Sequence, residues 1–223
     1  GHENLLVMQH AKNYNAHLNG LIMDAGRGSR HVLDFGAGVG ALAESARQWA
    51  KQLTCVELDP HQQDILRQKG FTAAPNLEAV SSEEVDFVYC VNVLEHIEDD
   101  AGVLTQLRDK LSNGGTLLLY VPALQFLFSQ MDVAVGHYRR YGKAGLCKLL
   151  LSVGYEIKSV QYVDFLGVFA TLCYKLVGDK NGTVNPKALK AYDLFAFPLS
   201  RQLDKLFHPL VGKNLLVIAK KNG

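Results

Sequence analysis

Short apolar runs alternate with amphipathic stretches along most of the chain. The runs predict strands at 31–35, 53–58, 71–74, 85–91, 116–121, 155–163 and 215–219. Between them, apolar residues recur at three- and four-residue spacing, which predicts helices, beginning with an N-terminal helix over 4–25. Strands that alternate with helices in this way indicate an α/β fold with an open, mostly parallel sheet and helices on both of its faces.

The 223 residues fit one domain with a full hydrophobic core, so we expect a single domain over 1–223. The segment 164–211, before the last strand, differs from the rest and predicts a helical, aromatic and basic insert. Its most apolar stretch, 165–174, is shorter than the about 20 residues that cross a bilayer. The insert is therefore a lid over the site, a homodimer surface or a peripheral membrane contact.

Charge divides the chain, although the net charge is only +1. Residues 1–137 carry a formal charge of −8, and residues 138–223 carry +9. The asymmetry predicts a surface for an anionic partner, or two parts that neutralise each other in the fold. Nucleic acid is the weakest candidate partner, because the overall charge is near zero and aromatic residues are interleaved only locally with basic ones.

The four cysteines show no CxxC spacing, and Cys55 and Cys90 lie within apolar runs. Such cysteines behave as small buried hydrophobic residues and indicate a reducing compartment. We expect a cytoplasmic protein, with the inner membrane face as a location if the insert contacts lipid.

A glycine-rich loop follows the first predicted strand, in the sequence Asp34-Phe35-Gly36-Ala37-Gly38-Val39-Gly40. Glycines at alternate positions let the backbone turn sharply and approach a ligand closely. Asp34 stands two residues before the first glycine and favours a ligand that carries a positive or amino group.

A second acid, Glu57, ends the next strand, 21 residues after Gly36. A carboxylate at this place can accept hydrogen bonds from both hydroxyls of a ribose. The glycine spacing also satisfies the relaxed dinucleotide pattern. A nicotinamide-dependent oxidoreductase is therefore one alternative, and a non-catalytic module that binds the cofactor is another.

Four segments together resemble the class I S-adenosylmethionine-dependent methyltransferases. They are Val32–Gly40, Val56–Asp59, Asp86–Ile97 and Gly114–Leu117, in the order and spacing of that family, and they cover roughly 30–121. The resemblance implies a Rossmann-like, mostly parallel sheet with a final antiparallel strand. It also implies S-adenosylmethionine as the methyl donor and S-adenosylhomocysteine as the product.

The resemblance also implies roles for residues at the strand ends. The loop with Asp34, Gly36, Ala37 and Gly38 would hold the methionine part of the cofactor, and Glu57 would bind its ribose. The remaining implied cofactor contacts are Leu58 and Asn76 at the adenine, Asn92 and Val93 near the methyl group, and Tyr14 as an aromatic cover. Asn76 stands where the family often has an acid, and a core or surface role for Tyr14 stays open.

The segment Gly136–Tyr141 places two arginines between two tyrosines, beside a histidine. Arginine binds phosphate or carboxylate through two parallel hydrogen bonds, so Tyr138, Arg139, Arg140 and Tyr141 are predicted to bind the substrate. The alternative is a loop in which both arginines pair with acids of the protein. The segment resembles a bacterial methyltransferase subgroup associated with glycosyltransferases and cell-surface polysaccharide assembly, which extends the resemblance to about 4–165.

A hydroxyl acceptor needs a base, and His137 and His96 are the candidates because their pKa values lie near neutrality. His96 is also a candidate structural residue. The spacing of the His, Cys and Asp residues suggests no metal ligands, so no metal is expected. The sequence does not define the acceptor; a sugar, a lipid-linked substrate or another anionic small molecule is expected.

Overall fold

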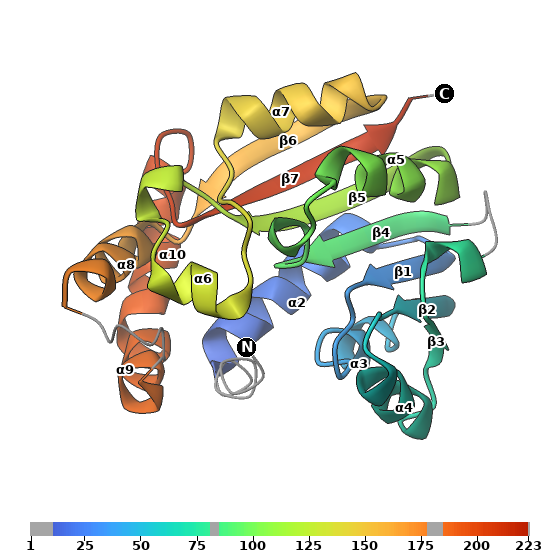
Figure 1. The fold of residues 1–223 in the computed structure, drawn as a ribbon, viewed down its shortest axis with the longest axis horizontal. Helices are drawn as coiled ribbons and strands as arrows, with labels where there is room; N and C mark the ends of the chain where they lie inside the picture. Colours follow the sequence, from blue (N-terminus) through green and yellow to red (C-terminus); the bar gives the residue numbers. More distant parts are fainter. Residues whose placement is uncertain (1–10, 81–84, 178–184, 223) are drawn as a thin grey trace.

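A computed structural model describes residues 11–80, 85–177 and 185–222. The strands are β1 (His31–Phe35), β2 (Gln52–Val56), β3 (Thr72–Ala74), β4 (Val85–Val91), β5 (Leu111–Pro122), β6 (Tyr155–Val163) and β7 (Asn214–Lys221). They form one sheet in the order β3-β2-β1-β4-β5-β7-β6 (Figure 1). β7 runs antiparallel to both of its neighbours, β5 and β6, and all the other strand pairs in the described residues are parallel. The predicted mostly parallel sheet with an antiparallel final strand is confirmed.

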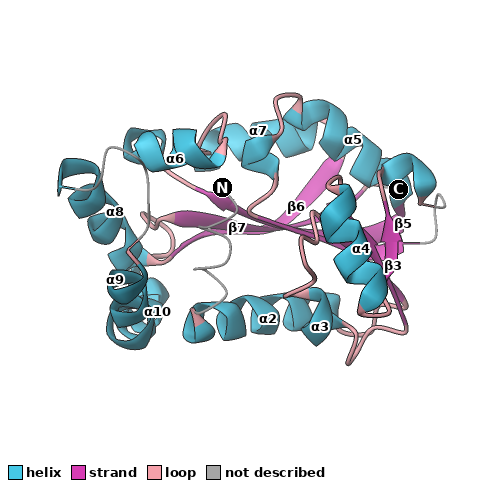
Figure 2. Ribbon diagram, turned by 60° about the horizontal axis from the view of Figure 1, so that its bottom comes forward, coloured by secondary structure: helices cyan, strands magenta, loops and turns pink. Residues whose placement is uncertain are grey.

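The helices lie on both faces of this sheet, as predicted. They are α2 (Lys12–Gly26), α3 (Ala43–Ala46), α4 (Pro60–Gln68), α5 (Asp100–Lys110), α6 (Gln130–Val135), α7 (Lys143–Ser152), α8 (Phe165–Val177), α9 (Pro186–Ala191) and α10 (Phe197–Phe207). Short helical turns are η1 (Leu77–Ala79), η2 (Leu94–His96), η3 (Gln125–Leu127) and the π-helix η4 (Tyr192–Ala196). Figure 2 shows α2 and α3 on one face and α5 and α7 on the other.

Two hydrophobic clusters attach these helices to the sheet. On one face, Leu104 of α5 and Leu150 of α7 pack with strand residues such as Val88. On the other face, Leu18 and Ile22 of α2 pack against the opposite side of the same strands. Parallel strands that are covered on both faces need apolar residues on both sides, and the apolar run of β4 meets this requirement.

The predicted helix after the glycine loop is shorter than its apolar spacing suggests. Gly40 still has a positive φ of 84°, so the turn extends to this residue and α3 begins only at Ala43. At the other end, the carbonyl of Ala46 accepts from both Trp49 and Ala50, which tightens the backbone into a turn. The non-helical turn after β1 is therefore longer than the apolar spacing predicts.

The N-terminal helix predicted over 4–25 is present as α2 from Lys12 onward, and residues 1–10 lie outside the described part. The segment 164–211 forms α8, α9, η4 and α10, with 178–184 outside the described residues. Asp204 of α10 accepts hydrogen bonds from the amides of Asp164 and Phe165, which joins the end of α10 to the start of α8. Within the described ranges, no helix combines the length and apolar character required to cross a bilayer.

Candidate active site

The candidate site lies between β1 and β4, where the strand order of the sheet reverses. From β1 the chain adds β2 and β3 on one side, and β4 and β5 follow on the other side. Ligands of open parallel sheets bind at the carboxyl ends of the strands beside such a point. The carboxyl ends of the neighbouring strands β1 and β4 lead into the loop 34–40 and the segment 92–96, so the structure brings these two motifs together.

The glycine loop requires its first glycine for two reasons. Gly36 has a φ of 80°, in the left-handed region that other residues rarely adopt. A Cβ atom at this position would lie 2.3 Å from Cγ2 of Val93, a residue predicted to line the cofactor. The amides of Gly36 and Ala37 both donate to the carbonyl of Val56, which turns the loop over the end of β2. The loop is thus a tight backbone cradle against the end of β4.

Asp34 is buried at the end of β1, beside this loop. Its Oδ2 has no hydrogen-bond partner among the described residues. Burial raises the pKa of Asp34 to about 7; the neighbouring Tyr89 hydroxyl lowers it, and the negative charge of Glu57 raises it. A buried carboxyl with an unpaired oxygen is ready for a cationic or amino group.

Glu57 follows β2 and faces the same loop. Its Oε2 accepts from the amide of Gly38 at 2.8 Å, and its Oε1 accepts from the amide of Asp59 at 2.9 Å. The next residue, Leu58, is 76% exposed and offers an apolar surface beside this carboxylate. An acid and an adjacent apolar side chain suit a ribose and its base.

Asn76 lies farther along the same edge of the sheet and is exposed. Its Oδ1 accepts from the amide of Ala79 and caps η1. The side-chain oxygen predicted to meet the adenine amino group therefore already has a structural partner, although a carbonyl oxygen has a second lone pair.

Asn92, directly after β4, contacts Tyr14 of α2. Asn92 has a positive φ of 53°, and its Nδ2 donates to the hydroxyl of Tyr14 at 3.3 Å. Tyr14 also packs edge-on against Tyr120 of β5 and Phe197 of α10. Burial raises the pKa of the Tyr14 hydroxyl to about 12. The structure thus places Tyr14 beside a predicted cofactor residue and joins it to the insert.

The two arginines of the 136–141 segment are engaged within the protein. Arg140 is only 5% exposed, and its Nε and Nη2 donate to the two carboxylate oxygens of Asp132 at 2.9 and 3.1 Å. Arg139 donates to Oδ2 of Asp100 at 2.6 Å and to the carbonyl of Glu98. These are the contacts of the alternative in which the arginines hold the loop. Direct substrate binding by Arg140 is incompatible with its burial and its paired guanidinium.

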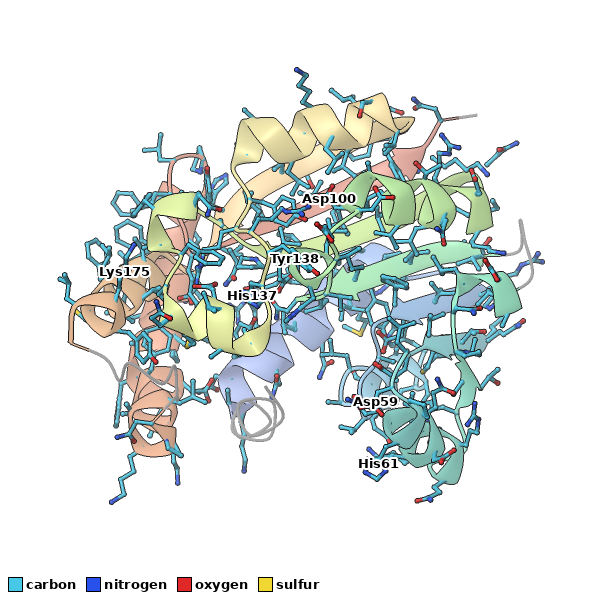
Figure 3. All side chains as sticks on the ribbon, viewed as in Figure 1. Asp59, His61, Asp100, His137, Tyr138 and Lys175 are labelled. Atoms are coloured by element: carbon cyan, nitrogen blue, oxygen red, sulfur yellow. The ribbon has the colours of Figure 1, made fainter. Side chains whose placement is uncertain are left out.

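The two tyrosines of the segment differ in their surroundings. Tyr141 is buried, and its hydroxyl donates to Oδ2 of Asp100 at 3.0 Å, which is again an internal contact. Tyr138 is largely exposed, and its amide donates to the carbonyl of Glu95 (Figure 3). Of the four predicted substrate residues, Tyr138 presents the most accessible side chain.

Both predicted histidines lie at this end of β4. The ring of His137 is 4.6 Å from that of His96, centroid to centroid. Nδ1 of His137 lies 2.8 Å from Oδ1 of Asp132, and its Nε2 lies 3.8 Å from Oε1 of Glu95. Glu95, His96 and His137 offer ligand atoms within 4.8 Å of one another, a grouping the sequence spacing did not predict.

Two acids of this region were not predicted as site residues. Burial tends to raise the pKa of Asp132, but hydrogen bonds from His137 and Arg140 outweigh this effect and hold the pKa at about 2. Glu95 is fully buried, and burial raises its pKa to about 8. The only sequence signals for them were an acid five residues before His137 and an acid directly before His96.

Comparisons with known proteins identify the family of this chain. A family model described as a methyltransferase domain matches residues 9–160, more than half of the chain. A ubiquinone biosynthesis O-methyltransferase of Xanthomonas oryzae pv. oryzae is 30% identical over 98 residues, which are 40% of this chain and 41% of that protein. The chain thus matches less than half of the length of this relative.

Solved structures share the fold at low identity. An S-adenosylmethionine-dependent methyltransferase from Archaeoglobus fulgidus superposes with a TM-score of 0.66 at 17% identity, over 95% of this chain and 94% of that one. Phosphoethanolamine N-methyltransferase 2 of Haemonchus contortus, solved with S-adenosylmethionine, has a TM-score of 0.61 at 15% identity, over 93% of this chain and 53% of that one.

The loop cradle, the unpaired Asp34 and the Glu57–Leu58 pair fit the predicted cofactor. The family match favours this interpretation over a nicotinamide-dependent oxidoreductase. The chain belongs to the methyltransferase domain family, and its cofactor is S-adenosylmethionine.

Proposed function

We propose that this chain transfers a methyl group to a hydroxyl oxygen of an acceptor that has an apolar portion. S-adenosylmethionine supplies the electrophilic methyl group when it is bound. Asp34 and the Gly36–Gly38 loop hold its charged end, and Glu57 holds its ribose. The protein positions the hydroxyl oxygen in line with the methyl carbon and takes up the hydroxyl proton as the new bond forms.

The observation that carries this proposal is the Asp132–His137 pair beside the end of β4. The short contact to Asp132 leaves Nε2 of His137 facing Glu95, three residues after Asn92. An imidazole oriented by a carboxylate suits the removal of a proton from a hydroxyl. An amine acceptor could be deprotonated by solvent and needs no such arrangement, so the pair favours an oxygen acceptor.

The insert supports an acceptor with an apolar portion. Large apolar side chains of its helices are exposed, namely Phe169, Leu176, Leu194, Phe195, Leu199 and Leu206. The insert borders the site, because Phe197 packs on Tyr14 and Lys175 donates to the carbonyl of Phe126 in η3. In Figure 1, α8 and α10 lie at the same end of the molecule as α6. A lipid-linked alcohol or sugar would fit this combination.

The partial similarity to the Xanthomonas ubiquinone biosynthesis O-methyltransferase supports oxygen as the acceptor atom. The cell-surface subgroup named from the sequence supports a sugar carried on a lipid. The name of the relative gives an oxygen acceptor, and a sugar also offers hydroxyl oxygens, so both favour this acceptor atom.

The test is methyl transfer from labelled S-adenosylmethionine to a total lipid extract and, separately, to an aqueous polysaccharide fraction. We expect label in the lipid extract, in a linkage that survives mild alkali as an ether does. His137→Gln should lower the rate at least about 100-fold, the usual scale for a general base. His61→Gln, at an exposed histidine far from His137 in Figure 3, is the matched control and should retain the wild-type rate.

Three outcomes would contradict the proposal in different parts. Label found only in the polysaccharide fraction would contradict the proposal that the acceptor has an apolar portion. Label that mild alkali releases would indicate a methyl ester, and therefore a carboxylate acceptor in place of a hydroxyl. Protein that binds S-adenosylhomocysteine but transfers no label to either fraction would favour a non-catalytic binding module.

A further inference from the structure

Three side chains with metal-binding atoms converge at the carboxyl end of β4. Glu95 and His96 come from η2, and His137 comes from the loop that follows α6. One ligand atom from each lies within 4.8 Å of the other two. Around a tetrahedral ion with metal–ligand distances of about 2.1 Å, two ligand atoms lie about 3.4 Å apart. The 3.8 Å between Glu95 and His137 is close to this separation, and binding an ion would require the three side chains to move inward by small rotations.

Glu95 supplies the main argument for a bound cation. Its side chain is fully buried, yet neither carboxylate oxygen has a hydrogen-bond partner in the described part of the chain. The positive charge of Arg140 acts on this carboxylate without a hydrogen bond to it. Folded proteins pair buried carboxylates or place them on a metal. Its nearest basic atom is Nε2 of His137 at 3.8 Å, which is too far for a hydrogen bond. An ion between the two groups would satisfy both.

His137 is held as metal-binding histidines are. Its Nδ1 pairs with Oδ1 of Asp132, so the proton lies on this side of the ring and Nε2 presents its lone pair toward Glu95. Arg140 fixes the Asp132 carboxylate from the other side with two hydrogen bonds. The buried Arg140–Asp132 pair therefore orients the imidazole, and this gives the Arg140 side chain a role at the site without substrate contact.

His96 lies against the loop that carries His137, and the two imidazole rings are 4.6 Å apart, centroid to centroid. The amide of Tyr138 donates to the carbonyl of Glu95 at 2.8 Å, which fastens the loop to η2. The two segments that carry the three side chains are thus joined by backbone contacts, and the cluster is a preformed feature of the fold.

We propose that Glu95, His96 and His137 bind a divalent transition-metal ion. Two imidazoles and one carboxylate are the ligands of zinc and of related ions, and three protein ligands leave a coordination position open. In the context of the proposed function, on which this role rests, the acceptor hydroxyl takes the open position. A bound ion would lower the pKa of that hydroxyl, whose proton would pass to solvent as the oxygen attacks the methyl carbon. With the ion bound, His137 would serve as a ligand, and the ion would replace its imidazole as the group that activates the hydroxyl.

The test measures metal binding without methyl donor or acceptor. The full chain is stripped with a chelator, dialysed, and titrated with Zn²⁺ by calorimetry and with Co²⁺ by its visible absorption. We expect one ion per chain, with an absorption spectrum of a nitrogen- and oxygen-ligated Co²⁺. Glu95→Gln and His137→Gln should each weaken Zn²⁺ binding at least about tenfold, and His61→Gln should not change it. Mg²⁺, which prefers an all-oxygen site, should not displace Zn²⁺.

Equal Zn²⁺ affinity in the wild type, Glu95→Gln and His137→Gln would overturn the proposal. Thermal unfolding tests whether each variant is folded. If the substitution of a buried residue prevents folding, His96→Gln at an exposed position provides a third variant. Because the titration measures no methyl transfer, metal binding can fail while methylation of the lipid extract succeeds, and metal can bind to a protein that transfers no methyl group. The metal site and the methyl transfer are therefore tested separately, and only the role of the ion in activating the hydroxyl depends on both.

Discussion

The amide nitrogen of Gly38 donates to Oε2 of Glu57 across 2.8 Å, so a predicted cofactor carboxylate also holds the glycine loop in place. The second oxygen of Glu57 accepts from the amide of Asp59, at the start of α4. Glu57 thus connects the ends of β1 and β2. Its carboxylate can shape the loop as well as bind a ribose.

Replacing Glu57 with Ala should weaken the binding of S-adenosylhomocysteine about 10- to 100-fold. This corresponds to about 1.4–2.8 kcal/mol, the scale of hydrogen bonds to a charged acceptor. Isothermal titration calorimetry measures the effect. Glu156→Ala, at an exposed acid on β6, is the control and should keep the wild-type affinity. Equal affinity in Glu57→Ala and the control would remove Glu57 from the site.

Cofactor affinity should depend on pH through Asp34. Burial raises the pKa of this carboxyl from its usual 3.8 to about 7 in the folded protein. A ligand with an ammonium group binds the ionised form, so S-adenosylhomocysteine should bind up to about tenfold more tightly at pH 8 than at pH 6. Asp34→Asn should remove this difference. A wild-type affinity that is constant over this range would contradict the assignment of Asp34 to the charged end of the ligand.

The stability of the unliganded protein should show the opposite dependence on pH. The folded state holds the Asp34 proton more tightly than the unfolded chain does. The stability this provides is fully present below about pH 4 and is lost as the pH rises to about 7. Urea denaturation of wild type and Asp34→Asn between pH 4 and pH 8 isolates the effect. The stability of the variant relative to the wild type should rise with pH, and a constant difference would count against the burial argument.

Replacing Gly36 with Ala should destabilise the protein by about 2–5 kcal/mol. The left-handed backbone conformation accounts for about 1–2 kcal/mol of this, and the clash with Val93 for about 1–3 kcal/mol. Gly28→Ala is the matched control, because Gly28 also has a positive φ but open space around it. Adding Val93→Ala to Gly36→Ala should recover the packing part in urea denaturation. If the double variant is no more stable than Gly36→Ala, the clash with Val93 is not a cause of the lost stability.

Arg140→Ala should destabilise the protein by about 3–5 kcal/mol, because it leaves the buried carboxylate of Asp132 without its cationic partner. Arg139→Ala removes a more exposed ion pair with Asp100 and should cost about 1 kcal/mol or less. The midpoints of urea denaturation compare the two. Equal effects of the two substitutions would contradict the different roles that their burial assigns to neighbouring arginines.

Much of the architecture was predictable because it depends on local patterns. Strand positions such as 31–35, 85–91 and 155–163 agree with β1, β4 and β6. Apolar periodicity could not locate the early end of α3, since that depends on the glycine turn. It also missed α6, whose start is set by a capping box between Ser129 and Asp132. Both errors concern short elements that are defined by a few backbone hydrogen bonds.

The cofactor side of the site followed from the sequence, because parallel strands joined by crossovers bring their carboxyl ends to one edge. Asp34, Glu57 and Asn92 each end a predicted strand, so their neighbourhood was predictable without knowing any contact. The acceptor side depended on tertiary structure. Whether an arginine is free or paired depends on how the chain folds around it. The folding of the 130–141 segment placed Arg140 on Asp132, and the packing of this segment near η2 and α5 brought His137 to Glu95 and Arg139 to Asp100.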